Sequence, residues 1–131
     1  MKRNLAPVRA LVRELIPLVG SFAPNGSSAL VATARKGLGF TVARTSAGLF
    51  TITFTDTQAD LVSFEHSLQH VTARDVYTQM GTLVNTTTPV VQIRVMDISG
   101  AAVDDLTADA NTRIHFTAWM RNSAAKPTYG A

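Results

Sequence analysis

Residues 48–55 read Gly-Leu-Phe-Thr-Ile-Thr-Phe-Thr, and this stretch decides the fold class. Successive side chains of an extended strand point to opposite faces, so Phe50, Ile52 and Phe54 share one face and the threonines share the other. The same alternation returns at residues 114–120, which read Ile-His-Phe-Thr-Ala-Trp-Met. A repeated period of two predicts half-buried strands of an antiparallel sheet.

Short segments of this type follow one another along most of the chain. We expect about seven strands, at residues 29–34, 38–44, 49–55, 61–70, 75–81, 89–97 and 113–121. Their number and spacing predict an antiparallel β-sandwich, with a small barrel as the alternative. The expected core is the apolar face of each strand: Phe40, Val42, Phe50, Ile52, Phe54, Val62, Phe64, Leu68, Val91, Ile93, Val95, Ile114, Phe116, Ala118 and Met120.

The N-terminal region shows a different, helical period. Between residues 4 and 19 the apolar positions recur in steps of three and four, and Pro17 is expected to end the helix. The apolar stripe consists of Leu5, Val8, Leu11 or Val12, Leu15 and Val19, and Arg9 and Arg13 share the opposite face. This short amphipathic helix has three possible roles: a cover for one end of the core, an arm that docks on a neighbouring subunit, or a membrane-surface helix.

Length and composition predict one β-domain with two appendages. The chain has 131 residues, which suits a single domain. We expect an N-terminal helical arm and linker at residues 1–28, the β-sandwich at 29–122 and a flexible C-terminal tail at 123–131. Cysteine is absent, which excludes disulfides, thiol nucleophiles and cysteine-based zinc sites.

Charge is distributed unevenly along the chain. Residues 1–44 hold seven basic residues and one acid, a net +6, whereas residues 45–131 hold five basic residues and eight acids, a net −3. The basic half suits an acidic protein surface, nucleic acid or anionic lipid. Aromatic residues do not accompany the basic ones, so no specific nucleic-acid partner is expected. No apolar run has the length of a membrane helix, and Arg9, Arg13 and Glu14 interrupt a signal-like start, so neither a membrane nor an export route is expected.

The residues that carry chemistry form no recognisable catalytic or metal-binding pattern. His66 and His70 are four apart on an expected strand, about 13 Å, which is too far to share one metal ion; on a helix the same spacing would work. The acids Asp97, Asp104, Asp105 and Asp109 lack the calcium-loop pattern and are expected to be solvated turn residues. We therefore expect no enzyme, no cofactor and no metal site.

Trp119 is the most notable side chain of the last strand. It is in phase with His115, Thr117 and Arg121, on the face opposite the expected core. A tryptophan beside an arginine suits an interface anchor. The alternative is that the N-terminal helix or a long loop covers it.

Taken together, several segments resemble small structural proteins of tailed bacteriophages. The resemblance is in residues 39–54, which read Gly-Phe-Thr-Val-Ala-Arg-Thr-Ser-Ala-Gly-Leu-Phe-Thr-Ile-Thr-Phe, and in residues 61–69, 92–97 and 111–116. It spans about residues 37–122 and does not include the N-terminal segment. Proteins of this kind are virion components, such as capsid decoration (cement) proteins, head fibres or tail-associated subunits, and are commonly trimers. They have no catalytic motif to carry over.

The resemblance implies a viral capsid decoration protein that assembles in the host cytoplasm and resides in the virion. The implied partners are the major capsid protein or neighbouring virion subunits, with a homotrimer as the implied state. A head-fibre or tail-associated module for host-surface binding is the alternative, and a virion hydrolase is disfavoured because no pair of catalytic acids is evident. The expected interface residues are Lys2, Arg3, Leu5, Val8, Arg9, Val12, Arg13, Leu15, Trp119 and Arg121.

Overall fold

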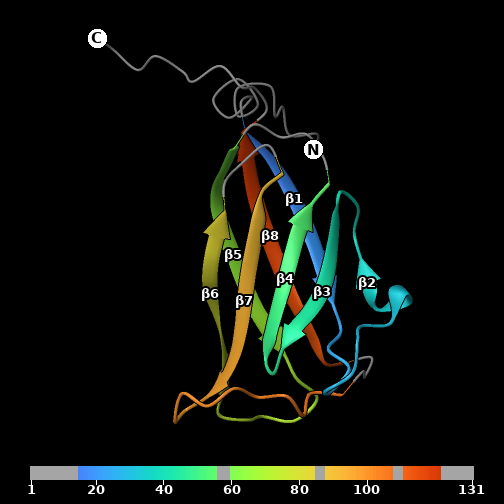
Figure 1. Cartoon of the computed structure of the whole chain (residues 1–131), viewed down its shortest axis with the longest axis vertical. Coiled ribbons are helices and arrows are strands. Elements are labelled where there is room, and N and C mark those ends of the chain that lie inside the picture. The colour runs from blue at the N-terminus through green and yellow to red at the C-terminus, as the bar shows by residue number, and fades with distance from the viewer. Residues whose placement is uncertain (1–14, 56–59, 85–87, 108–110, 122–131) are drawn as a thin grey trace, which may run out of the picture.

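The computed structural model describes residues 15–55, 60–84, 88–107 and 111–121. Within these ranges the chain is mainly β (Figure 1). The elements are β1 (Leu15–Phe22), η1 (Ala32–Ala34), β2 (Arg35–Lys36), β3 (Phe40–Ser46), β4 (Leu49–Phe54), β5 (Asp60–Gln69), β6 (Val76–Val84), β7 (Val90–Asp97) and β8 (Arg113–Arg121).

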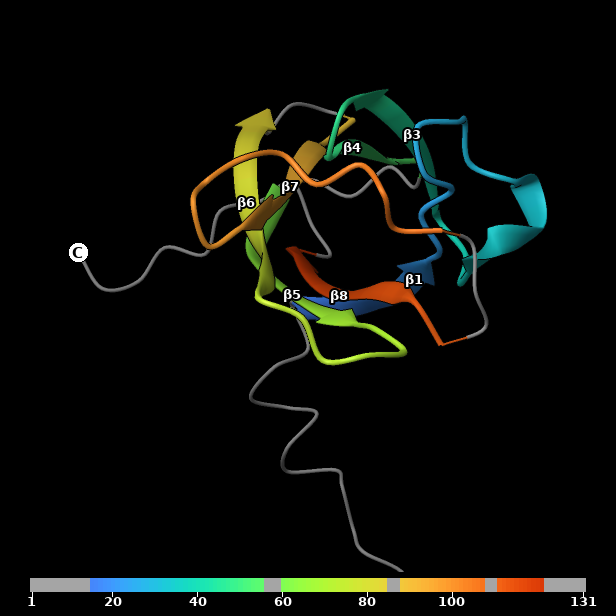
Figure 2. The same cartoon turned by 90° about the horizontal axis from the view of Figure 1, so that it is seen from below.

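The strands form two antiparallel sheets of four strands each. One sheet has the order β2-β1-β8-β5 and the other the order β3-β4-β7-β6. The sheets face each other across a common interior (Figure 2), and β5 approaches β6 along one flank. The architecture is therefore consistent with the predicted β-sandwich.

The core fills the space between the two sheets, as the period of two predicted. Phe50, Ile52 and Phe54 are at most 2% exposed, while the alternate positions of β4 are partly exposed. Phe116 of β8 contacts the rings of Phe40, Phe54 and Phe64 from the facing sheet and from β5, with centroid distances of 4.8, 6.3 and 5.4 Å. The alternation in sequence is thus an alternation between core and outer face.

The predicted N-terminal helix is wrong where the structure describes it. Residues 15–22 form β1, which pairs with β8 along its whole length, from Leu15 opposite Arg121 to Phe22 opposite Ile114. The inward face of β1 consists of Ile16, Leu18, Gly20 and Phe22. The apolar positions of this segment therefore fit the period of two of a strand as well as the three- and four-residue steps of a helix. Pairing with the central strand β8 overrides the local helical pattern. Residues 4–14 of the predicted helix lie outside the described residues.

The strand predicted at residues 29–34 is also wrong. This segment contains the short η1 turn, and only Arg35 and Lys36 pair with β1, opposite Phe22 and Ser21. The strand beside β8 on this side is β1. One smaller difference concerns Val62, expected in the core but 48% exposed, because an irregularity in the pairing between Leu61 and Ser63 turns Leu61 inward in its place.

Candidate functional site

The outer face of the β2-β1-β8-β5 sheet presents a regular grid of side chains in which β8 is the central strand. The outward residues of β8 are His115, Thr117 and Trp119, each partly exposed between buried neighbours. The register places β1 and β5 residues on either side of each. The cross-strand rows are Pro17–Trp119–Ser63, Val19–Thr117–Glu65 and Ser21–His115–Ser67.

Three of the predicted interface residues lie at one end of this face: Leu15, Trp119 and Arg121. Trp119 lies opposite Pro17, and Leu15 lies opposite Arg121 in the next row. The backbone of Arg121 is part of β8, whereas its side chain is outside what the structure describes. The chain enters β1 at Leu15, where the start of β1 lies beside the end of β8 (Figure 1). The basic N-terminal segment is therefore joined to the protein at the corner that contains Trp119. Lys2, Arg3, Leu5, Val8, Arg9, Val12 and Arg13 lie outside the described residues.

A shallow hollow of about 310 Å³ lies further along the same face. Its outward lining includes Val19, which is 63% exposed, and the polar side chains of Glu65, Ser67, His115 and Thr117. His115 Nε2 lies 2.9 Å from Gln69 Oε1, so this ring nitrogen is engaged by an amide and not by Ser67. The hollow therefore offers hydrogen-bonding groups to a ligand but no assembled serine–histidine pair. Val19 was not predicted to be an outward residue of a strand, because the sequence pattern placed it in the apolar stripe of a helix. The alternation of Ile16, Leu18 and Phe22 would have indicated its outward position.

The side chain of His66 lies where the two sheets approach each other and links them. Its Nδ1 lies 2.7 Å from Thr78 Oγ1, and this contact joins β5 to β6 where the two sheet edges approach each other. His70 directly follows β5, and its Nδ1 lies 2.6 Å from the backbone oxygen and 3.0 Å from the backbone nitrogen of Thr72. Within the described ranges, no group of three metal-ligating side chains is present.

The position of His66 predicts that stability depends on pH. Burial lowers the pKa of His66 below its ordinary value of 6.5. The unfolded chain then binds the proton more readily than the folded one, so stability is complete above pH 6.5 and falls as the pH drops from 6.5 towards the folded pKa. We expect the melting temperature to decline between pH 7 and pH 5, and we expect His66→Gln to flatten this part of the profile. An unchanged slope in the variant would assign the dependence to another group.

Of the loop acids, Asp104 is held by hydrogen bonds, contrary to the sequence prediction, whereas the side chain of Asp105 is 67% exposed, as predicted. Arg44 donates from Nε to Asp104 Oδ1 at 3.1 Å and from Nη2 to Oδ2 at 2.5 Å, and the backbone N–H of Gly48 donates to the same carboxylate at 3.3 Å. These contacts, led by the hydrogen bond from Arg44, lower the pKa of Asp104. Asp105 pairs with Arg74 at 3.1 Å. These acids therefore attach the loop after β7 to the rest of the fold. Asp109 lies outside the described residues.

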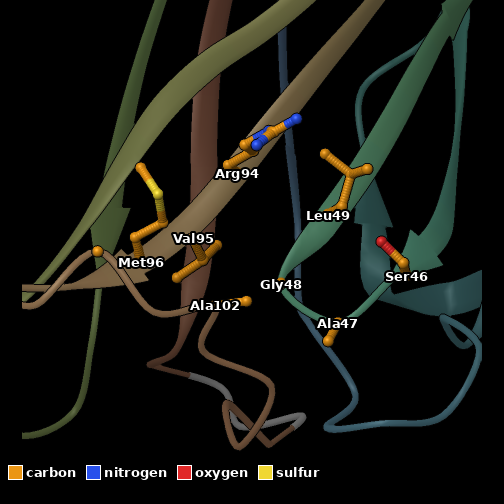
Figure 3. Close-up of a pocket in the computed structure, with 9 residues that line it drawn as sticks. Ser46, Ala47, Gly48, Leu49, Arg94, Val95, Met96 and Ala102 are labelled. Carbon is orange, nitrogen blue, oxygen red and sulfur yellow. The ribbon is translucent and has the colours of Figure 1, made fainter.

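A second hollow, of about 200 Å³, lies at the β3–β4 hairpin beside this loop. Figure 3 shows Arg94 and Leu49 above it, with the hairpin residues Ala47 and Gly48 and the loop residue Ala102 below. Apart from Arg94, its side chains are small, apolar or hydroxyl-bearing. It offers one cation and few directional groups, which makes it a poorer candidate than the outer face of β1, β8 and β5.

Comparison with known proteins yields no relative for the chain. No family model, no curated protein and no solved structure matches it. Among the described residues, no helix has the length and apolar character needed to cross a bilayer.

Proposed function

We propose that the protein is a structural component of a bacteriophage virion that decorates and stabilises the assembled head. The proposal comes from the resemblance in residues 37–122. One observation supports the proposed mode of attachment: the basic N-terminal segment joins the fold at the corner formed by Leu15, Pro17 and Trp119. A tryptophan beside a proline on a sheet face is a suitable buried anchor, and the arginines and lysine of residues 1–14 suit an acidic shell.

The proposed mechanism is stabilisation by selective binding. A protein that binds the assembled shell, and not its separated subunits, shifts the equilibrium towards the shell in proportion to its binding free energy. Attachment as a homotrimer would let three copies of the corner engage neighbouring shell subunits together, which raises the overall affinity without new contacts. The major capsid protein is the proposed partner, and the virion is the proposed location.

Occupancy on heads that lack the protein tests this function. Purified wild-type protein should bind such heads in many copies and raise their disassembly temperature. Trp119→Ala should weaken binding by at least about tenfold, because an anchor residue contributes more than about 1.4 kcal/mol. Replacing Lys2, Arg3, Arg9 and Arg13 together with glutamine should weaken binding and reduce its dependence on salt.

The matched control is Tyr77→Ala. Tyr77 is a 46% exposed aromatic residue on β6, in the other sheet, and its loss should leave occupancy unchanged. Failure of the wild-type protein to bind heads would overturn the proposal. Equal weakening by Tyr77→Ala and Trp119→Ala would leave head binding standing but remove the corner as its site.

A head-fibre or tail-associated module for host-surface binding is the second candidate. The polar hollow beside Val19, with Glu65, Ser67, His115 and Thr117, favours it, because such groups can hydrogen-bond to a surface polymer. This candidate requires attachment at only a few sites per particle. The copy number of the chain in an intact virion therefore separates the two candidates.

A further inference from the structure

Strand β3 is an edge strand whose free side is defined by the hydrogen-bond pattern. It pairs with β4 alone, with Phe40 opposite Phe54 and Val42 opposite Ile52. The N–H of Thr55 donates to Gly39 O at 2.9 Å, which makes Gly39 and Thr55 a hydrogen-bonded pair. Since such pairs alternate along an antiparallel ladder, the N–H and C=O of Phe40 and Val42 point away from β4.

The surroundings of Phe40 confirm this direction. The guanidinium of Arg35 donates from Nη1 to the Phe40 carbonyl oxygen, and it also lies 5.4 Å from the centre of the Phe40 ring. The carbonyl oxygen of Phe40 therefore already accepts a hydrogen bond on the free side of β3. Val42 has no corresponding partner among the described residues, so its N–H and C=O remain available at the middle of the edge.

A hollow of about 320 Å³ lies alongside this edge. Thr41 and Val42 of β3 line one side of it, and the segment before β2, which runs past β3 in Figure 1, lines the other. The remaining lining residues are Phe22, Leu30, Val31, Ala32 and Arg35. The volume is within the range of ligand sites, and the lining is mostly apolar. An extended chain beside β3 could therefore pair with Val42 and place an apolar side chain in the hollow.

The charge around the hollow indicates what kind of chain fits. Arg35 lines the hollow and is exposed, whereas Lys36 follows it on the opposite face of β2; the ion pairs within the described residues, Arg44–Asp104 and Arg74–Asp105, do not involve Arg35. The chain's own terminal segments have the same sign: residues 1–14 hold four basic residues and one acid, and residues 122–131 hold Lys126 and no acid. Charge complementarity therefore favours a foreign acidic segment over either terminus.

We propose that the β3 edge accepts an extended, acidic segment of a partner protein as an added strand. The segment pairs with the N–H and C=O of Val42, fills the adjacent hollow with an apolar side chain, and directs carboxylates towards Arg35. The edge of β1 is less suitable, because Pro17 lies in it and β2 pairs with its last two residues. Strand β3 contains neither proline nor lysine, residues that commonly protect an edge from pairing.

The probe is a peptide of seven alternating valine and threonine residues followed by three glutamates, compared with a twin that ends in three lysines. The wild-type protein should bind the glutamate peptide more tightly than the lysine peptide. Binding should slow hydrogen exchange at the amide of Val42, which faces the added strand. Arg35→Glu should weaken binding of the glutamate peptide about fivefold, the effect of about 1 kcal/mol from a surface charge.

Two further variants make the test specific. Arg94→Glu introduces the same charge change on an exposed β7 residue away from the β3 edge and should leave binding unchanged. Val42→Pro removes the outward N–H without removing a bond to β4, and it should abolish binding. If Val42→Pro fails to fold, the comparison of Arg35→Glu with Arg94→Glu and the exchange of the Val42 amide in the wild-type protein decide the question.

Three results would overturn the proposal. The first is binding of neither peptide, or equal binding of both. The second is peptide binding without protection of the Val42 amide. The third is protection of this amide that grows with protein concentration in the absence of peptide, because the occupant would then be a second copy of the chain. None of these measurements uses phage heads, so they stand apart from the test of head decoration.

Discussion

Replacing Phe116 with alanine should lower the free energy of unfolding by about 3–5 kcal/mol. Phe116 is 2% exposed and its ring contacts Phe40, Phe54 and Phe64, so it joins both sheets at the centre of the core. Removing the ring loses its transfer free energy and leaves a cavity that rigid aromatic neighbours fill poorly. Since small domains have about 5–15 kcal/mol of stability, this single change should remove a large part of it. Denaturation by urea measures the loss directly.

The control for Phe116→Ala is Thr117→Ala on the same strand. Thr117 faces outward in the row of Val19 and Glu65 and is only partly buried. Its replacement should change the free energy of unfolding by no more than about 0.5 kcal/mol. A loss of less than 1 kcal/mol for Phe116→Ala, or similar losses for the two variants, would contradict the placement of Phe116 between the sheets.

Replacing Gly48 with alanine should lower the free energy of unfolding by about 2–4 kcal/mol, for two reasons that add. Gly48 has φ of +61°, a conformation that residues with a Cβ adopt only at a cost. A Cβ at this position would also lie 2.7 Å from Val95 O and 3.0 Å from Val103 O, in the middle of the hairpin–loop contact (Figure 3). Both obstacles are backbone atoms that cannot rotate away. Thermal or urea denaturation of the variant measures the combined cost.

Gly100 provides a matched control for the second of these reasons. It also has a positive φ, +84°, but no atom lies within 4 Å of the position that its Cβ would take. Gly100→Ala should therefore cost only the backbone strain, about 1 kcal/mol. Equal losses for Gly48→Ala and Gly100→Ala would mean that the loop after β7 shifts freely to admit the extra methyl group.

The strands with a clear period of two were predictable from sequence, and the site was predictable only in part. The inward positions of β4 and β8 and the outward position of Trp119 follow from alternation alone, because the pleat assigns a face to every residue once a strand is recognised. The pairing of Arg44 with Asp104, 60 residues away, does not follow, because no local rule relates a residue of β3 to a residue of the loop after β7. Asp104, expected from the sequence to be solvated, is therefore held in an ion pair.

The helical reading of residues 15–19 failed for a related reason. Apolar residues at 15, 16, 18 and 19 fit a helix and a strand equally well over so short a window, and Pro17 is compatible with the end of a helix or with an edge strand. The partner strand β8 resolves the ambiguity, since it offers a full-length ladder of hydrogen bonds and buries Phe22. The predicted roles of residues 2–13 in attachment stay predictions.

Local alternation was enough to predict that this protein is built from amphipathic strands and which faces of most of them are apolar, because the pattern repeats every two residues. Three features became visible only in the folded chain: β1 completes a sheet beside β8, Leu15 and Trp119 share one corner, and β3 has a free edge beside a hollow. These features depend on which strands pair with each other, and this pairing is determined by burial and hydrogen bonding between distant parts of the chain.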